Sequence, residues 1–463
     1  MPTPLHQLDT PLKNSEIVTY KTALENTQGN MLKSHGRDHC AHVFLTFTGN
    51  LDAVKQFVAA MSLHVTSAAE QQAQTDRHKA NPHVNEMFTQ FLLSARGYEY
   101  IGSNTTGFSP QFRSGMKGSA TLLADPPVAA WEDRYKRELH ALIILAHDIP
   151  DALEDRVDEL ETALRGVADM FVQDGTAMHN ADGNTIEHFG YVDGRSQPRF
   201  FEQEVIDEKG GTANWDPSAG PSLILLKDPL GSSDDDCSSY YVFRKLEQDV
   251  RGFKQHEQDL ANALALTGGA RELAGAMVVG RFEDGTPVVL HDDAVVHQPA
   301  GPAAIIENDF TYAAADAPGS KCPFSGHIRK TNPRGDTGNI PAEKTRRIAR
   351  RGITFGDPTP PGDDISKLPT GGVGLLFQCC NKAIDQQFEF MQSAWADNPH
   401  FTHNAGVDPV MGQANGSGFP AQNWPAPYGS PTRVSFGFNN FVHMRGGEYF
   451  FVPSITFLKS LAH

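Results

Sequence analysis

The sequence HALIILAHDIPDALEDRVDELETALRGVADMF, residues 140–171, decides the fold class. Its first eight residues form an apolar run bounded by histidines, which is typical of a buried strand. Pro150 then begins a helix that extends to about Val167, because proline at the first helical position loses no hydrogen bond. A further strand begins near Phe171. The segment therefore predicts a strand, a helix and a second strand in succession.

The preceding residues extend this pattern toward the N-terminus. His42–Thr48 alternates between apolar and polar residues and predicts a strand. Leu51–Leu63 has helical spacing, with Asn50 as its expected cap. Short strands are expected at Gln90–Ser94 and Ala120–Leu123. The resulting order of elements is typical of a ferredoxin-like α+β domain with an antiparallel sheet.

The second half of the chain repeats the same order more loosely. We expect strands at Ser222–Leu226, Ser238–Phe243, Ile353–Phe355, Val373–Cys379 and Tyr449–Pro453, and helices at Phe253–Leu266 and Ala383–Trp395. The sequence thus predicts an N-terminal arm at 1–27 and two ferredoxin-like domains at 28–215 and 216–463, with a Gly/Pro-rich linker at 209–221. An irregular insert at about 281–345 is long enough to suggest a functional role.

Composition excludes several classes of protein. The chain has 463 residues, of which 39% are hydrophobic and 21% charged, which is typical of a globular protein. Its formal charge of −17 disfavours a nucleic-acid partner. No apolar run is long enough to cross a membrane. The N-terminus lacks the pattern of a secretory signal, so we expect a cytoplasmic protein, or a secreted one if this is a mature form. The five cysteines do not form a disulfide framework, which favours a reducing compartment.

Three segments contain residues that could carry chemistry. In the first, HFGYVDGRSQP at 188–198, glycines flank Asp193, and an Asp-Gly pair by itself is most often a turn. In the second, CPFSGHIRKTNPR at 322–334, His327 could bind a metal or haem, and the cations after it would suit haem propionates. A hydrogen-bonded loop histidine is the plainer alternative. Cys322 has no partner at zinc spacing.

The third segment is RRIARRGITFG at 346–356, where four arginines occupy six positions. Such a run is usually a solvated face. If the segment is extended, however, Arg350 and Arg351 point to opposite faces of the strand, and one of them is buried. A buried arginine would need a carboxylate or an anionic ligand.

Taken together, these segments resemble the dye-decolourising peroxidases, a haem peroxidase superfamily. The resemblance rests on Gly190-Tyr-Val-Asp-Gly194, on the His327 and Arg350 segments, on Gly374–Phe377 and on an opening segment at 28–39, and it covers about residues 25–455. It implies two ferredoxin-like domains with one haem b in the second, and it resembles the long fungal and cyanobacterial forms most.

The resemblance also implies roles for individual residues. His327 would be the axial ligand of the haem iron, with Asp193 and Arg350 as the catalytic pair on the distal face and Asp408 as a candidate carboxylate partner of His327. Trp395 would occupy the position of a surface tryptophan that some relatives use for electron transfer. The implied contacts with the cofactor come from Gly190, Gly194, Arg195, Gln197, Arg329, Leu375 and Phe377.

The expected activity follows from these roles. Hydrogen peroxide would be cleaved with Asp193 moving a proton and Arg350 stabilising the departing charge, and the resulting ferryl porphyrin radical would oxidise dyes and phenols in one-electron steps. A haem-handling protein with incidental peroxidase activity is the alternative, and the presence of both distal residues favours the enzyme. We expect a monomer or homodimer that binds neither nucleic acid nor membranes.

Overall fold

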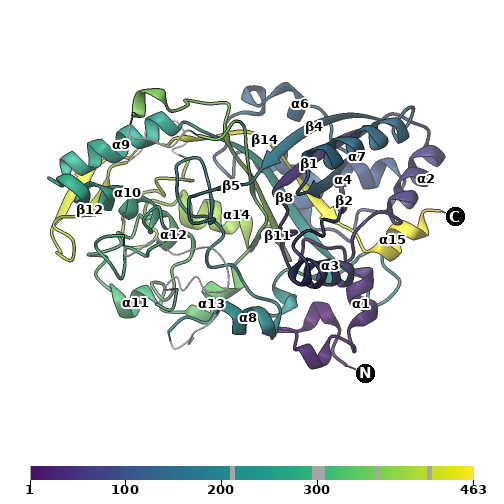
Figure 1. Cartoon of the computed structure of the whole chain (residues 1–463), viewed down its shortest axis with the longest axis horizontal. Helices are drawn as coiled ribbons and strands as arrows, with labels where there is room; N and C mark the ends of the chain where they lie inside the picture. Colours follow the sequence, from purple (N-terminus) through teal and green to yellow (C-terminus); the bar gives the residue numbers. More distant parts are fainter. Residues whose placement is uncertain are drawn as a thin grey trace.

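A computed structural model of the chain describes residues 2–208, 214–294, 308–359, 364–413, 420–438 and 440–462. Its centre is one antiparallel sheet of ten strands (Figure 1). Eight of them follow the order β10-β11-β8-β14-β2-β3-β1-β4, and the two short strands β7 and β9 pair with β8 and β11 beside this path. The strands are β1 (His39–Phe47), β2 (Phe88–Ser94), β3 (Ala141–His147), β4 (Ala168–Thr176), β5 (Met178–His179), β6 (Thr185–Ile186), β7 (Leu226–Lys227), β8 (Cys237–Gln248), β9 (Ala349–Arg350), β10 (Ile353–Phe355), β11 (Gly374–Asn381), β12 (Gln422–Pro425), β13 (Arg433–Phe436) and β14 (Val442–Val452).

Helices surround this sheet and fill the loops of the second half. They are η1 (Leu5–Gln7), η2 (Asn14–Glu16), α1 (Lys21–Asn26), α2 (Leu51–Met61), α3 (Ala68–Ala80), α4 (Ala95–Tyr100), α5 (Pro110–Ser119), η3 (Val128–Ala130), α6 (Asp133–Lys136), α7 (Pro150–Ala163), α8 (Glu202–Glu208), η4 (Pro221–Leu223), α9 (Val250–Ala263), η5 (Gly268–Arg271), α10 (Glu272–Val279), α11 (Tyr312–Ala315), α12 (His327–Thr331), α13 (Ile340–Thr345), η6 (Ile365–Lys367), α14 (Phe388–Phe390), the π-helix η7 (Met391–Ala396) and α15 (Ile455–Ser460).

The sheet consists of two ferredoxin-like halves, as the sequence predicts. In the first half the order β4-β1-β3-β2 places the first and third strands in the centre, and β14-β8-β11-β10 repeats that arrangement in the second. The halves join where Phe450 and Phe451 of β14 pair with Ser94 and Leu93 of β2. The two outer strands, β10 and β4, also approach each other, since Thr354 of β10 donates a hydrogen bond to the carbonyl of Thr176 in β4. The sheet is therefore continuous across both predicted domains.

Several sequence predictions are confirmed almost to the residue. The apolar run at 141–147 is the buried strand β3, and Pro150 is the first residue of α7. The Asn50 side chain accepts a hydrogen bond from the Ala53 amide at 2.9 Å and so caps α2. The N-terminal arm is ordered, because Leu5 and Leu12 are fully buried. The linker predicted at 209–221 lies partly outside the described residues.

Other sequence predictions are wrong. Ala120–Leu123 forms a turn after α5, where Leu123 is buried without joining a sheet. Ser222 and Leu223 belong to the 3₁₀ turn η4, which Pro221 begins, and of the predicted strand Ser222–Leu226 only Leu226 lies in a strand. The helix expected at Ala383–Trp395 begins as a turn and becomes the π-helix η7.

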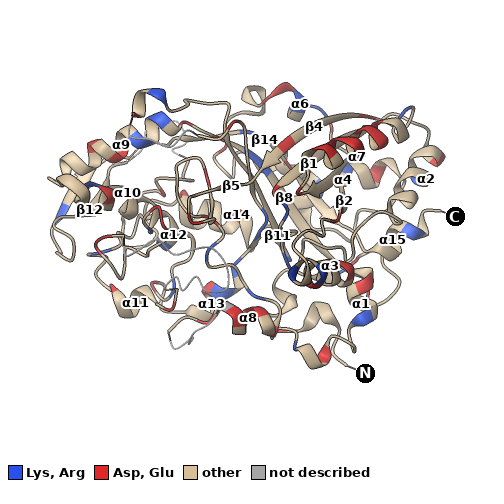
Figure 2. Cartoon of the chain, viewed as in Figure 1, with Lys and Arg blue, Asp and Glu red and all other residues tan. Residues whose placement is uncertain are grey.

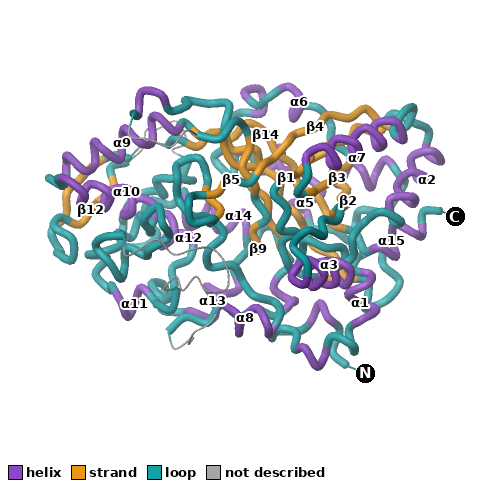
Figure 3. Tube along the Cα trace, in the orientation of Figure 1, coloured by secondary structure: helices purple, strands orange, loops and turns teal. Residues whose placement is uncertain are grey.

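The two halves differ in how much regular structure surrounds them. Around the first half the strands are covered by helices such as α2 and α7, whereas loops dominate beyond β8 and β11 (Figure 3). Acidic side chains colour much of α7, in keeping with the net charge of −17 (Figure 2). None of the described helices is both long and apolar enough to span a bilayer.

Candidate active site

A cavity lies between the second half of the sheet and the loops that cover it. One face of β8 lines it with Arg244, Leu246 and Gln248, and one face of β11 lines it with Leu375 and Phe377. Because side chains alternate across a strand, residues two apart reach the same cavity. The remaining walls come from the loop at 187–198, from α12, from the π-helix and from neighbouring segments. They include Phe189, Asp193, Arg195, Val279, His327, Ile328, Arg347, Arg350, Met391, Gln392, Met411, Gln413 and Val442.

His327 lies at the first position of α12 and is held by a carboxylate. Its Nδ1 lies 2.9 Å from Oδ2 of Asp408, which is fully buried. The other oxygen of Asp408 accepts hydrogen bonds from the backbone amides of Val410 and Met411. Burial would raise the pKa of Asp408, but His327 and these amides hold it below its ordinary value. Since Nδ1 is engaged, Nε2 is the nitrogen left to bind a metal, and the structure thereby pairs the two residues as the sequence predicts.

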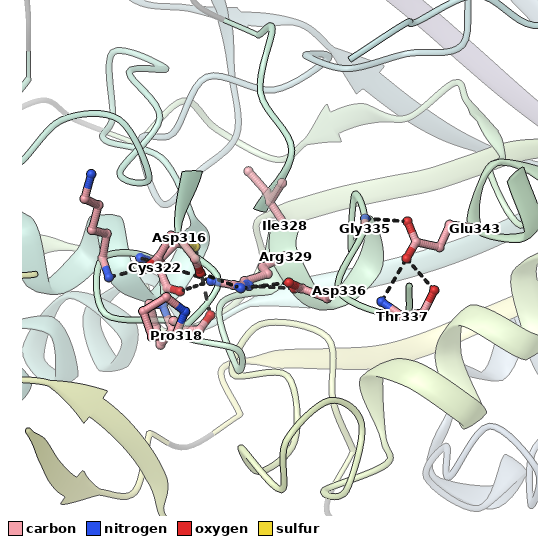
Figure 4. A network of polar contacts seen from close by, with 12 residues as sticks. Asp316, Pro318, Cys322, Ile328, Arg329, Gly335, Asp336, Thr337 and Glu343 are labelled. Carbon is pink, nitrogen blue, oxygen red and sulfur yellow. Dashed lines mark hydrogen bonds and ion pairs between the residues drawn. The ribbon is translucent and has the colours of Figure 1, made fainter. Parts of the chain in front are cut away.

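Arg329 anchors the same short helix to the loops that precede and follow it (Figure 4). Its fully buried guanidinium donates to both carboxylate oxygens of Asp336, at 2.7 and 2.8 Å, and to Oδ2 of Asp316 at 3.0 Å. It also donates to the carbonyl of Cys322. Arg329 does not line the cavity, so its predicted contact with the cofactor is corrected to a structural role. The two acidic partners lie 13 and 7 positions from Arg329 along the chain, and neither spacing by itself indicates an ion pair.

We expect Arg329→Met to destabilise the protein strongly. The substitution leaves two buried carboxylates without their cation, and the loss of one partner from such a pair typically costs about 3–5 kcal/mol. Thermal unfolding should therefore begin at a clearly lower temperature. Arg96→Met removes an exposed ion pair with Glu99 and serves as the control, with unfolding close to that of the parent. Equal unfolding of both variants would contradict the structural role of Arg329.

Asp193 and Arg350 meet at the cavity wall. Arg350 Nη1 lies 2.9 Å from Oδ1 of Asp193, and Nη2 donates to the carbonyl of Arg195 at 2.7 Å. The Gly194 amide donates to the same carboxylate oxygen at 2.6 Å. Within the described chain, Oδ2 of Asp193 accepts no hydrogen bond, which leaves it available to a small molecule. The structure therefore brings together two residues that are 157 positions apart in sequence.

The two adjacent arginines point to opposite sides, as the extended-segment hypothesis predicts. Arg350 reaches the cavity, whereas Arg351 is buried and donates to the carbonyls of Asn30 and Met31. Carbonyl oxygens thus satisfy this guanidinium, and the expectation that it needs a carboxylate or an anion is wrong.

The loop that carries Asp193 is held to the sheet by two side chains. His188 is hydrogen-bonded through Nε2 to the Phe355 carbonyl at 2.9 Å and through Nδ1 to Thr359 Oγ1 at 2.8 Å. Glu187 accepts from the amides of Phe189 and Tyr191 and from the side chain of Gln248. Burial raises the pKa of Glu187 to about 7, and lowers that of His188.

Tyr191, within the same loop, lines the cavity and donates a hydrogen bond to the buried carboxylate of Glu257. Lys254 forms ion pairs with Glu257 at 2.9 Å and with Glu283 at 2.6 Å.

In the described part of the chain, no group of three or more histidine, cysteine, aspartate or glutamate side chains is arranged to hold a metal ion.

Other predicted contacts do not reach this cavity. Gly190 and Gly194 have φ values of +97° and +79° and shape the turns around Asp193, and neither lines the cavity. Gln197 accepts from the Arg350 amide at 3.2 Å, so it holds the arginine in place. These three residues lie beside Asp193 and Arg350, and their contact with a cofactor stays a prediction. Arg195, Leu375 and Phe377 line the cavity, and their contact with a cofactor stays a prediction.

Some cavity residues were missed by sequence reasoning. The predicted strand Ser238–Phe243 ended too early, because the polar run after it does not look like a buried strand. In the structure β8 continues to Gln248 and lines the cavity with alternate residues of that run. Period-2 alternation of Arg244, Leu246 and Gln248 is the signal that could have found them.

Trp395 is not a surface residue. Its side chain is 6% exposed, and its ring stacks on Phe401 at 5.2 Å between centroids and meets Phe390 edge to face. Trp395 belongs to the π-helix η7, where a regular helix was expected. The prediction of a surface electron-transfer residue is therefore corrected.

We expect Trp395→Phe to reduce the turnover of bulky dyes and of small phenols by the same factor, within about twofold. The indole lies under Phe401, so a dye cannot touch it, and phenylalanine preserves much of the stacking. Steady-state turnover of one dye and one phenol by the same preparation measures the ratio. A selective loss of dye oxidation would contradict this expectation and restore the electron-transfer role.

The residues around the cavity fit a haem. His327 presents one ring nitrogen while a carboxylate holds the other, which is the usual arrangement for a histidine that ligates a metal. Leu246, Leu375, Phe377 and Val442 supply apolar walls for the macrocycle. Arginines at the rim can pair with its carboxylates. One of these, Arg347, is largely buried, and burial lowers its pKa to about 10.

Comparison with known proteins agrees with this site. Residues 26–185 match the family model described as the DyP dimeric alpha+beta barrel domain. The multifunctional dye peroxidase DyP2 of Amycolatopsis sp. is 40% identical over 457 residues, which cover 95% of this chain and 96% of the relative. The dye-decolorizing peroxidase of Auricularia auricula-judae is 32% identical over 74% of this chain and 70% of its own length.

A solved structure gives the same result. The crystal structure of the DyP-type peroxidase of Anabaena sp. superposes with a TM-score of 0.91 at 38% identity and covers all of both chains. The fold and the site thus define a haem peroxidase built from two ferredoxin-like domains. The chain belongs to the dye-decolourising peroxidase family.

Proposed function

We propose that this chain binds one haem b in the cavity and uses hydrogen peroxide to oxidise dyes and phenolic compounds. The observation that carries the proposal is that one cavity contains both the His327–Asp408 pair and the Asp193–Arg350 pair. When bound, haem supplies the iron that cleaves the peroxide O–O bond and stores the two oxidising equivalents. The names of the relatives support dyes as substrates.

His327 is proposed as the axial ligand through Nε2. Its Nδ1 proton is held by Asp408, which fixes both the tautomer and the orientation of the ring. A carboxylate in this position also increases the electron density that the imidazole donates. The pair therefore both holds the cofactor and favours its oxidised states.

Asp193 is proposed to move the proton that peroxide cleavage requires. Its Oδ2 would accept a proton from one oxygen of hydrogen peroxide and return it to the other, which would then leave as water. The Arg350 guanidinium donates to Oδ1 and so holds the carboxylate with Oδ2 turned to the peroxide. The same cation stabilises the negative charge that develops on the departing oxygen.

Haem handling with incidental peroxidase activity is the alternative function. Binding alone needs only His327 and an apolar pocket, and it gives no reason for a paired carboxylate and guanidinium in the same cavity. The Asp193–Arg350 ion pair therefore favours the enzyme.

An absorption spectrum of haem-replete protein, taken before and within milliseconds after one equivalent of hydrogen peroxide, tests the proposal. We expect a Soret band typical of histidine-ligated ferric haem that changes on mixing. Bound haem that is inert to peroxide would support the haem-handling alternative. Failure to bind supplied haem would exclude both functions.

We propose that the protein is a monomer or homodimer, and light scattering can test this oligomeric state. We also propose that it has no nucleic-acid or membrane partner. A cytoplasmic location is supported by the cysteines, since all five are buried and unpaired.

A further inference from the structure

Lys330 is a buried cation that the proposed mechanism does not use. It follows His327 by three positions on α12 and is 1% exposed. Its ammonium donates hydrogen bonds to the carbonyls of Asn398 and Phe401, and no carboxylate of the described residues lies within 4.0 Å of it. A buried ammonium without a paired carboxylate is costly, and burial lowers the pKa of Lys330 to about 8.

Two carboxylates exert a charge interaction on this cation. The first is Asp408, which accepts from His327 Nδ1. The second is Asp397, which accepts from the Gln413 amide at 2.6 Å and from the Gln392 side chain at 3.1 Å. Burial, together with the charge of Asp408, raises the pKa of Asp397 to about 7.

One short segment of chain connects all three charges. The Asp408 amide donates to the carbonyl of Ala396 at 2.9 Å, so the backbone next to Asp397 touches the backbone of Asp408. The carbonyls that bind Lys330 belong to residues 398 and 401 of the same segment. The charges of both aspartates act on Lys330, and Arg244 is a further cation that acts on Asp397. Because the charged side chains are buried, or half-buried for Asp397, solvent screens the interactions between them less than it would at the surface.

The position of these charges determines their effect on His327. A nearby cation makes Asp408 a weaker hydrogen-bond acceptor, and a nearby anion makes it a stronger one. A stronger acceptor draws the Nδ1 proton and raises the basicity of the imidazole toward a metal. More electron donation from the ligand stabilises ferric over ferrous haem.

We propose that Lys330 and Asp397 are positioning residues that set the reduction potential of the haem in opposite directions, through the Asp408–His327 hydrogen bond. Lys330 raises the potential and Asp397 lowers it. The inference deepens the proposed function, because it rests on His327 being the haem ligand.

Spectroelectrochemical titration of haem-replete variants tests the proposal directly. The titration is made at about pH 7.5, above the pKa of Asp397 and below that of Lys330, so that both side chains are mostly charged. At a fixed applied potential, we expect Lys330→Met to lower the ferrous-to-ferric ratio by about three- to tenfold and Asp397→Asn to raise it by a similar factor. A tenfold change corresponds to about 59 mV for one electron. The double variant should return close to the parent ratio, because the two charges are removed together.

Controls separate charge from structure. Lys330→Arg keeps the charge and should stay within about twofold of the parent. Lys227→Met and Asp234→Asn remove the two partners of an exposed ion pair at 2.9 Å and should leave the ratio unchanged. A purely structural role would shift both Lys330→Met and Asp397→Asn in the same direction, which would overturn the proposal.

The experiment also distinguishes this inference from the function on which it rests. If the parent shows no histidine-ligated haem spectrum, the proposed function fails and the inference fails with it. If the parent binds haem and both variants keep its potential, the function stands and the electrostatic role of Lys330 and Asp397 is wrong.

Discussion

Asp193→Asn is expected to slow the reaction with hydrogen peroxide by about 10²- to 10⁴-fold, the range that removal of a general base typically produces. Asparagine has the same shape and can keep the hydrogen bond from Arg350, but it cannot take up the peroxide proton. Haem content and the spectrum of the resting protein should stay those of the parent, because Asp193 contacts Arg350 and Gly194 and lies on another segment from His327. Stopped-flow absorption of the Soret band measures the rate.

Arg350 supplies the matched comparison for this prediction. Arg350→Leu removes the cation that stabilises the departing charge and should also slow the reaction by a large factor. Arg350→Lys keeps the charge but loses the second donor to the Arg195 carbonyl, and should give an intermediate rate. Peroxide reaction at the parent rate in both Asp193→Asn and Arg350→Leu would remove these residues from the proposed mechanism.

The elements that could be predicted from the sequence are those governed by local patterns. The apolar run of β3, the proline that begins α7 and the asparagine that caps α2 each depend on residues within a few positions. The order of such elements was sufficient to predict two ferredoxin-like halves. Pairing of β2 with β14, which makes the sheet continuous, joins residues more than 350 positions apart and has no local signal.

The candidate site was predictable only where residue chemistry was distinctive. His327, Asp193 and Arg350 stand in segments that resemble those of a known family, and the structure gathers all three around one cavity. Arg329 was misread because its partners, Asp316 and Asp336, lie on loops that only the fold brings together. Sequence spacing cannot show whether a guanidinium faces a cavity or a buried carboxylate.

Trp395 was misread for a different reason. The family resemblance implied a surface tryptophan at the end of a predicted helix, whereas in the structure Trp395 lies in the π-helix η7 and stacks on Phe401. An extra residue in one helical turn is a tertiary effect that leaves little trace in the sequence. Side-chain direction within irregular helices is thus the least predictable part of this site.

His327→Ala is expected to reduce haem affinity by at least about 100-fold, because it removes the only proposed bond to the iron and leaves Asp408 buried without its partner. Haem titration followed at the Soret band measures the affinity. Added imidazole should restore part of the binding and the histidine-like spectrum in the variant, which a merely destabilised fold would not allow. Asp408→Asn should keep haem with a weakened Fe–His bond, since the amide oxygen can still accept from Nδ1. His83→Ala, at an exposed position, is the control. Unchanged haem affinity and ligation in His327→Ala would show that another residue binds the iron.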